Sequence, residues 1–233
     1  MPRKARRHEK TRSAYLWVVV LIVAVGLAGI YLAVQAPGGI NGTGLTGNGV
    51  QPLTISPLNP VLGSQNSSFT IFEFGDFQCP SCDYWFKTQE QAVVQNLVDS
   101  GRAKLVWRDF IIYDSDSRVA ASAAYAAGEQ GKFWEFHNLL YSNQGQANSG
   151  WVTQQLMTSF AERLGLNLTE FTQSMNSGKY NSLIASNFQS GQQLGVAGTP
   201  TFFVVGPTGQ YVKISGPQPE SVFEQAINSL GGG

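Results

Sequence analysis

The pattern of apolar and polar positions predicts strands on either side of one helix in the first part of the folded region. Short runs of β-branched and aromatic residues at 69–74 and 103–112 are typical of largely buried strands. Between them, Pro80 suits the first position of a helix and Gly101 closes it. Apolar side chains recur on one helix face at a period of 3.6 residues: Cys82, Phe86, Val93 and Leu97. This order predicts a βαβ unit with parallel strands.

The second part of the pattern predicts a block of helices and then a hairpin. Helical periodicity with glycine or asparagine at each junction covers about 115–194. The runs TFFVV and YVKI follow, separated by Gly-Pro-Thr-Gly at 206–209, and a last helix is expected at about 219–230. The predicted fold class is therefore α/β, in the order β-α-β, helical insertion, β-β-α, over a domain at 53–233.

The first 52 residues do not have the sequence pattern of a folded domain. Six of the 15 basic residues lie within the first twelve positions, and the stretch 15–34 is twenty residues without a charge. At about 1.5 Å per residue, such a helix spans the ~30 Å bilayer core. We expect a cytoplasmic basic tip at 1–14, a transmembrane signal-anchor at 15–34 and a flexible Gly-rich linker at 35–52. A cleaved signal peptide is the alternative, and both place the domain outside the cytoplasm.

The composition excludes several kinds of ligand and binding site. The 233 residues carry 15 Lys and Arg, 15 Asp and Glu, two histidines and two cysteines. Two cysteines make no disulfide scaffold, and with two histidines they supply no separate zinc site, so we expect no metal. A G-x-G-x-x-G match at 42–47 lacks the preceding strand and following helix of a nucleotide site. The basic tip adjoins an apolar segment, which argues against nucleic-acid binding.

The pair Cys79-Pro80-Ser81-Cys82 is the strongest chemical signal. A disulfide closing so short a loop restrains the unfolded chain little, so a purely structural role is disfavoured. On a helix the two sulfurs share a face, and Cys79 at the N-terminus meets unsatisfied N–H groups that favour its thiolate. We therefore expect a redox-active Cys79–Cys82 disulfide with no other cofactor, in which Cys79 is the reactive thiol and Cys82 the resolving one.

These features together resemble the DsbA-like thioredoxin-fold oxidoreductases, particularly their membrane-tethered, BdbD-like kind. The resemblance covers roughly 56–230 and is carried by FEFGDFQCPSC, FWEFH and GVAGTPTFFV. It implies a thioredoxin fold and a cis-proline at Pro200, beside the cysteines. It also implies that the backbone of Thr199 pairs with the substrate peptide. A quinone-linked reoxidase of the DsbB or VKOR type is the membrane partner that it implies.

The sequence also suggests catalytic or structural roles for several other polar residues. Glu73 lies where the resembling proteins carry a buried acid that exchanges a proton with the resolving cysteine; the alternative is a strand residue facing solvent. Ser81 stands where the best-known DsbA dipeptide has histidine and brings no positive charge to the thiolate. Asp76 suits loop capping. His137 suits packing or a surface hydrogen bond, and the acids of YDSDSR suit helix capping.

The predicted function is an extracytoplasmic thiol:disulfide oxidoreductase that introduces disulfides into exported, thiol-containing proteins. A reductase of the same fold is the nearest alternative, distinguished by redox potential. A non-enzymatic peptide-binding module would keep its activity without Cys79. A disulfide isomerase, which generally needs a dimerisation module, and a Cu(I) carrier rank lower.

Overall fold

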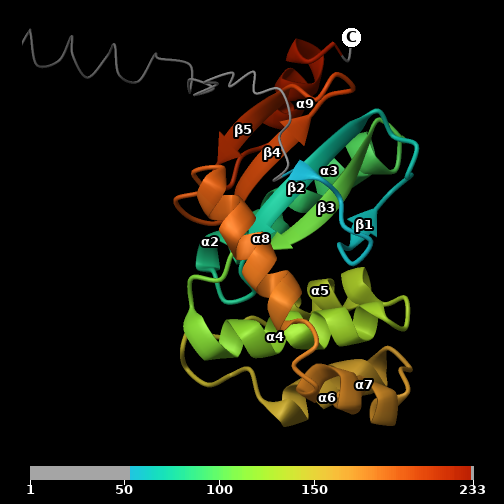
Figure 1. Ribbon diagram of the computed structural model, residues 1–233, viewed down its shortest axis with the longest axis vertical. Coiled ribbons are helices and arrows are strands. Elements are labelled where there is room, and N and C mark those ends of the chain that lie inside the picture. Colours follow the sequence, from blue (N-terminus) through green and yellow to red (C-terminus); the bar gives the residue numbers. More distant parts are fainter. Residues whose placement is uncertain (1–52, 232–233) are drawn as a thin grey trace, which may run out of the picture. The chain divides into compact units, whose positions relative to one another are not determined.

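The computed structural model describes residues 53–231, which form a mixed sheet surrounded by helices (Figure 1). The strands run in the order β1-β3-β2-β4-β5, and only β2 and β3 are parallel. Their bounds are β1 Val61–Leu62, β2 Phe69–Gly75, β3 Ala103–Asp109, β4 Thr201–Val205 and β5 Tyr211–Ser215. The predicted parallel βαβ unit and the β4–β5 hairpin are confirmed. The two-residue β1 has no counterpart among the predictions.

The helix after β2 is less regular than its periodicity predicts. It consists of α2 Pro80–Trp85, the π-helical turn η2 Phe86–Glu90, α3 Gln91–Val93 and a second π-helical turn η3 Val94–Val98. The strand predicted at 103–112 also ends earlier, at Asp109. Beyond it, the N–H groups of Ile112 and Tyr113 donate to the Asp76 carboxylate instead of to a neighbouring strand, which ends the pairing.

Five helices form the insertion between β3 and β4, as predicted. They are α4 Asp114–Gly128, α5 Phe133–Ser142, α6 Gln154–Arg163, α7 Leu168–Asn176 and α8 Asn181–Gln193. Figure 1 shows α4 and α5 beyond the ends of β2 and β3, with α6 and α7 further out. The last helix, α9 Glu220–Ser229, follows the hairpin.

Each face of the sheet packs against different helices. On one face, Ile71 and Phe202 pack with Trp85 of α2 and Phe223 of α9. On the other, a separate cluster brings Phe74 and Phe203 together with residues of α8 and the segment after it. A third cluster fills the insertion and extends to both cysteines. The cysteines therefore lie where the sheet meets the insertion.

The predicted tip, anchor and linker at 1–52 lie outside the described residues. Within residues 53–231, no helix combines the length and the apolar character needed to cross a membrane.

Candidate active site

The two cysteines lie at the start of α2, directly after the loop that follows β2. Cys79 is the extended N-cap residue and Pro80 occupies the first helical position, as predicted. Both cysteines are free thiols in this structure. Cys79 is 4% exposed and Cys82 only 1% exposed, whereas Pro80 and Ser81 are exposed beside them. The outer cysteine is thus the one within reach of a partner, and the inner one faces the core.

The surroundings of Cys79 favour its thiolate. A hydrogen bond from the Cys82 side chain is the largest cause that lowers the pKa of Cys79 to about 6, and the backbone N–H groups of Cys82 and Ser81 add to it. Burial opposes the shift. The Cys79 Sγ also lies 3.3 Å from the Thr199 carbonyl, which accepts from the protonated thiol. The Thr199 hydroxyl has no other hydrogen-bond partner within residues 53–231 and can donate to the thiolate.

The surroundings of Cys82 favour its protonated thiol instead. Burial raises its pKa well above the ordinary value, and the hydrogen bond to Cys79 raises it further. The two sulfurs are therefore unequal: near neutral pH the outer one is ionised and the inner one keeps its proton.

Glu73 lies on β2 within the apolar core, facing the same side of the sheet as Ile71. Its register partners are Trp107 on β3 and Phe202 on β4, and it is 1% exposed. Burial raises the pKa of Glu73 well above its usual range, and repulsion from Glu90 adds to this. Its charge also raises the pKa of Cys82, and the helical segment that begins at Pro80 packs on the face of the sheet to which Glu73 points. The solvent-facing alternative for Glu73 is therefore excluded.

The loop that carries Cys79 is anchored by side chains on both sides. The Asp76 carboxylate accepts hydrogen bonds from the N–H groups of Gln78, Ile112 and Tyr113, at 2.7 to 3.0 Å, and from the Ser117 hydroxyl at 2.6 Å. Asp76 thus holds two loops together, in agreement with the capping role expected for it.

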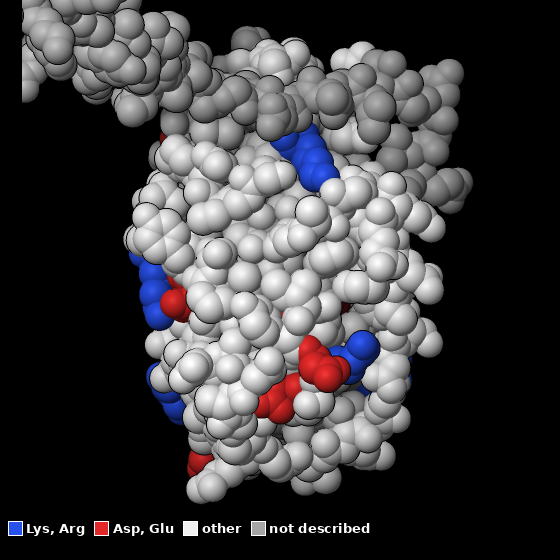
Figure 2. Space-filling model, turned by 90° about the vertical axis from the view of Figure 1, so that its left-hand side faces the viewer, with Lys and Arg blue, Asp and Glu red and all other residues white. Residues whose placement is uncertain are grey.

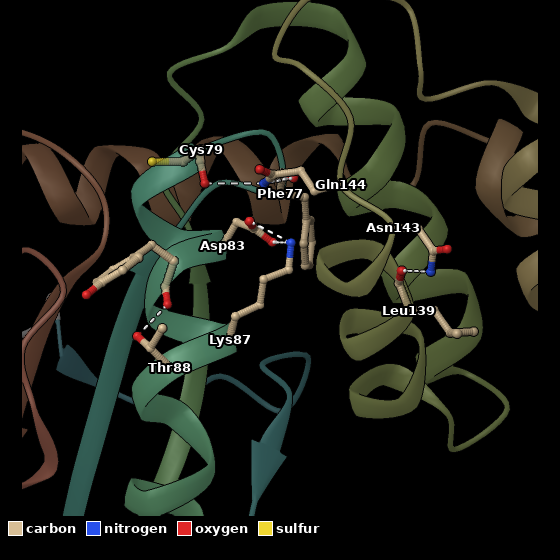
Figure 3. A network of polar contacts seen from close by, with 9 residues as sticks. Phe77, Cys79, Asp83, Lys87, Thr88, Leu139, Asn143 and Gln144 are labelled. Carbon is tan, nitrogen blue, oxygen red and sulfur yellow. Dashed lines mark hydrogen bonds and ion pairs between the residues drawn. The ribbon is translucent and has the colours of Figure 1, made fainter.

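Gln144 supports the same loop from the insertion. Its Nε2 donates to the carbonyl oxygens of Phe77, at 2.8 Å, and Cys79, at 3.2 Å (Figure 3). Figure 3 shows its amide reaching the loop from the segment after α5, while the Cys79 sulfur points away from it.

The segment before β4 completes the site. The Thr199–Pro200 peptide bond is cis, as the resemblance implies, and the Pro200 carbonyl accepts from the Gly216 N–H at 2.9 Å. The contact between Cys79 and Thr199 brings residues 120 positions apart together. The structure therefore gathers Cys79, Cys82, Glu73, Thr199 and Pro200 in one place.

Two residues of the site have no counterpart in the sequence predictions. Glu90 is a charged residue on a helix, and only its place eight residues after Cys82 hints at burial. Gln144 lies in a loop without a recognisable pattern.

His137 is fully buried among rings, 5.2 Å from Trp107 and 4.9 Å from Tyr141 between centroids, so packing is its role and the surface alternative is wrong. Within residues 53–231, no His, Cys, Asp and Glu side chains are grouped as metal ligands.

A Cys-x-x-Cys pair at a helix start, after a central strand and opposite a cis-proline, defines a thioredoxin-fold redox site. In agreement with this, residues 56–228 match the thioredoxin family. The chain is 30% identical over 149 residues to the probable disulfide bond formation protein D of Bacillus cereus, covering 62% of this chain and 69% of that protein. The crystal structure of oxidised BdbD from Bacillus subtilis superposes with a TM-score of 0.66 at 23% identity, covering 74% of this chain and 93% of that one.

A further relative is a longer protein of a different name. The chain is 36% identical over 156 residues to the Na(+)/H(+) antiporter NhaA 1 of Salinispora arenicola, covering 64% of this chain but 22% of that protein. The chain thus spans about a fifth of the length of that relative. Taken with the site, these similarities show that the chain belongs to the thioredoxin family, among its DsbA-like thiol:disulfide oxidoreductases.

Proposed function

We propose that the Cys79–Cys82 pair oxidises thiols of exported proteins and is itself the only redox group required. The observation that carries this proposal is the inequality of the two sulfurs. Cys79, with a pKa lowered to about 6, contacts Thr199 beside the cis-proline, whereas the pKa of the buried Cys82 is raised. A stable Cys79 thiolate favours the reduced protein, which makes the disulfide a better oxidant.

The proposed cycle begins with the disulfide form. A substrate thiolate attacks the Cys79 sulfur, the Cys79–Cys82 bond breaks, and Cys82 leaves with the electron pair and takes up a proton. A second substrate thiolate then attacks the substrate sulfur of the mixed disulfide and displaces Cys79 as a thiolate. The substrate has lost two electrons and gained a disulfide, and the protein holds them as a reduced pair.

The surface around the site suits extended, unfolded chains. Tyr84 on α2 and Ile112 beside the Asp76 loop are large apolar side chains, 57% and 45% exposed. The face of the molecule on the side of α2 carries few charged groups (Figure 2). We propose that the Thr199 backbone pairs with the substrate peptide and that apolar contacts hold it without strong sequence preference.

Location and reoxidation follow from the same proposal. A domain that makes disulfides works outside the cytoplasm, where they persist, and the basic and apolar segments of the first 34 residues support a membrane anchor with a cytoplasmic N-terminus. The reduced pair then needs an oxidant, and we propose a quinone-linked membrane reoxidase of the DsbB or VKOR type.

The direction of the reaction is tested by the redox potential. The full-length protein is equilibrated with glutathione buffers, and the thiols of Cys79 and Cys82 are trapped at each ratio. We expect a value between about −240 and −120 mV, because thioredoxin at about −270 mV has a less acidic cysteine and DsbA at about −120 mV a more acidic one. A value at or below about −270 mV would support the reductase instead.

Two variants accompany this measurement. Cys82→Ser should accumulate mixed disulfides on Cys79, and Cys79→Ser should lose all exchange with substrate thiols. If Cys79→Ser keeps full activity toward unfolded proteins, the chain is a peptide-binding module and the oxidase proposal is wrong.

A further inference from the structure

Glu90 is a buried acid in the helical segment that carries the cysteines. It is 6% exposed and ends the π-helical turn η2. It follows Cys82 by eight residues with Phe86 midway, so the three lie along one side of the segment. π-Helical turns are frequent at functional sites. Its Oε2 has no hydrogen-bond partner within residues 53–231, an arrangement that costs stability and calls for an explanation.

Glu73 on β2 shares both features. It is buried, its Oε2 likewise has no partner in the described part of the chain, and repulsion between the two carboxyls contributes to its altered acidity. None of the four ion pairs found within residues 53–231 involves either glutamate. Glu73 points to the same sheet face as Ile71, and the helical segment that carries Glu90 covers this face. Two carboxyls buried there without a cation cannot both ionise readily, so the pair retains at least one proton near neutral pH.

The other titratable groups around the pair come from α5, from α2 and from the edges of this region. From α5, burial lowers the pKa of His137 to about 4, which leaves it neutral, and raises the pKa of Tyr141, which leaves it protonated. α2 contributes the cysteines. Three charged groups at the edges of this region are already hydrogen-bonded or paired: Asp76 with the 112–117 loop, Asp83 with Lys87, and Glu224 of α9 with Arg102.

We propose that Glu90 is the outer member of a buried carboxyl pair that relays a proton between solvent and Glu73, and through Glu73 to the Cys82 sulfur. Glu90 is the more exposed of the two, at 6% against 1%, and is therefore the member through which a proton enters. This role rests on the proposed function, because only a sulfur that breaks and remakes a disulfide needs repeated protonation.

Reduction of the disulfide moves a proton inward along the carboxyl pair. When the Cys79–Cys82 bond breaks, the Cys82 thiolate takes the proton of the Glu73 carboxylic acid through an intervening water. Glu73 becomes a carboxylate and takes the proton of Glu90 in the same way, and Glu90 is reprotonated from solvent. One proton thus moves from solvent to Cys82 for each disulfide reduced. Reoxidation reverses every transfer and returns the proton to solvent.

The test compares Glu90→Gln, which keeps the shape but loses the proton, with Glu90→Asp, which restores a carboxyl. The rate of reduction of the full-length disulfide form by glutathione is followed by tryptophan fluorescence between pH 6 and 9. We expect Glu90→Gln to be about tenfold slower at pH 7 and to lose the inflection near pH 8, and Glu90→Asp to recover both in part. Glu162→Gln, at an exposed position of α6, should match the wild type.

A second measurement reads the pair directly and does not depend on a variant that folds. Carbon NMR of side-chain-labelled glutamate should show two carboxyls of the reduced wild type that titrate well above the ordinary range of glutamate, one of them near pH 8. If every glutamate titrates near its ordinary pKa, or if Glu90→Gln keeps the wild-type pH profile, the relay is wrong. A wild type that forms no Cys79–Cys82 disulfide would instead overturn the proposed function.

Discussion

Two groups of buried polar side chains lie close together in this molecule and have opposite hydrogen bonding. Asp109, at the end of β3, is 1% exposed, and its carboxylate accepts from the Trp107 Nε1 at 3.0 Å, the Tyr125 hydroxyl at 2.5 Å and the Asn187 Nδ2 at 3.0 Å. Glu73, on the neighbouring strand and equally buried, has one oxygen without any partner in the described residues.

The difference separates a structural acid from a chemical one. Burial raises the pKa of Asp109, but its donors from Tyr125, Trp107 and Asn187 act against the shift. For Glu73 and Glu90 no donor opposes burial, and both pKa values rise. An acid with a full set of donors is fixed in one state and links elements, whereas an acid with an unpartnered oxygen holds a proton that it can release.

The largest expected effect comes from breaking the Asp109 group. Asp109→Ala leaves the buried donors of Trp107 on β3 and Tyr125 on α4 without this acceptor and removes one of the two hydrogen bonds of Asn187 Nδ2 on α8. Each buried donor left unpaired costs about 1 to 3 kcal/mol. We therefore expect the free energy of unfolding to fall by about 3 to 5 kcal/mol, measured by urea denaturation at pH 7.

The same variant separates stability from chemistry. In its folded state, the alkylation rate of Cys79 should follow the wild-type pH dependence, because Asp109 makes no contact with the cysteines. A loss of stability below about 1 kcal/mol, or a displaced Cys79 titration, would contradict the structural role assigned to Asp109.

The next effect concerns the carboxyl pair and has a defined sign. Burial raises the pKa of Glu90 to about 8, so the folded protein keeps a proton that the unfolded chain releases above about pH 4.5. The stability associated with this proton is complete below about pH 4.5 and is lost as the pH rises through about 8. One retained proton changes stability by about 1.4 kcal/mol per pH unit.

Urea denaturation at pH 5.5 and 7.5 measures this slope. Over these two pH units, the wild type should lose up to about 3 kcal/mol more than Glu90→Gln, which has no proton to release there. Glu162→Gln again serves as the control and should keep the wild-type slope. Equal slopes for Glu90→Gln and the wild type would show that Glu90 is ionised in the folded protein.

Most of the fold could be predicted because its signals are local. Runs such as FTIFEF are apolar on both faces, Pro80 and Gly101 mark helix ends, and the βαβ order fixes the parallel pair. The π-helical turns leave no mark in the 3.6-residue periodicity, and the early end of β3 was missed because it depends on a tertiary contact. Asp76, 36 residues away, captures the N–H of Ile112, and no pattern around residue 112 encodes this.

The residues of the site also divide into those with a local sequence signal and those placed by tertiary contacts. Cys79 and Cys82 stand out by spacing, and Pro200 by resemblance, whereas Glu90 was missed because a charged residue on a helix is normally assigned to solvent. Its burial follows from the irregular helix and from α5 packing against it. Gln144 was missed because its bonds to Phe77 and Cys79 join residues more than 60 positions apart.

The smallest expected effect concerns Gln144, whose hydrogen bonding is intermediate between that of Asp109 and that of Glu73. Its amide nitrogen makes two hydrogen bonds, but the side chain is only half-buried, so water can replace these bonds when Gln144 is removed. Gln144→Ala should therefore cost about 1 kcal/mol of stability and displace the Cys79 pKa by less than about half a unit, measured by the pH dependence of iodoacetamide alkylation.

Asn143→Ala is the matched control for this variant. It also removes an amide-to-carbonyl hydrogen bond, from Nδ2 to the Leu139 carbonyl at 2.7 Å, but within the last turn of α5 and away from the cysteine loop (Figure 3). Only Gln144→Ala should change the Cys79 titration. If both variants displace it equally, the change is transmitted through α5, and the loop is held by Asp76 and not by the Gln144 amide.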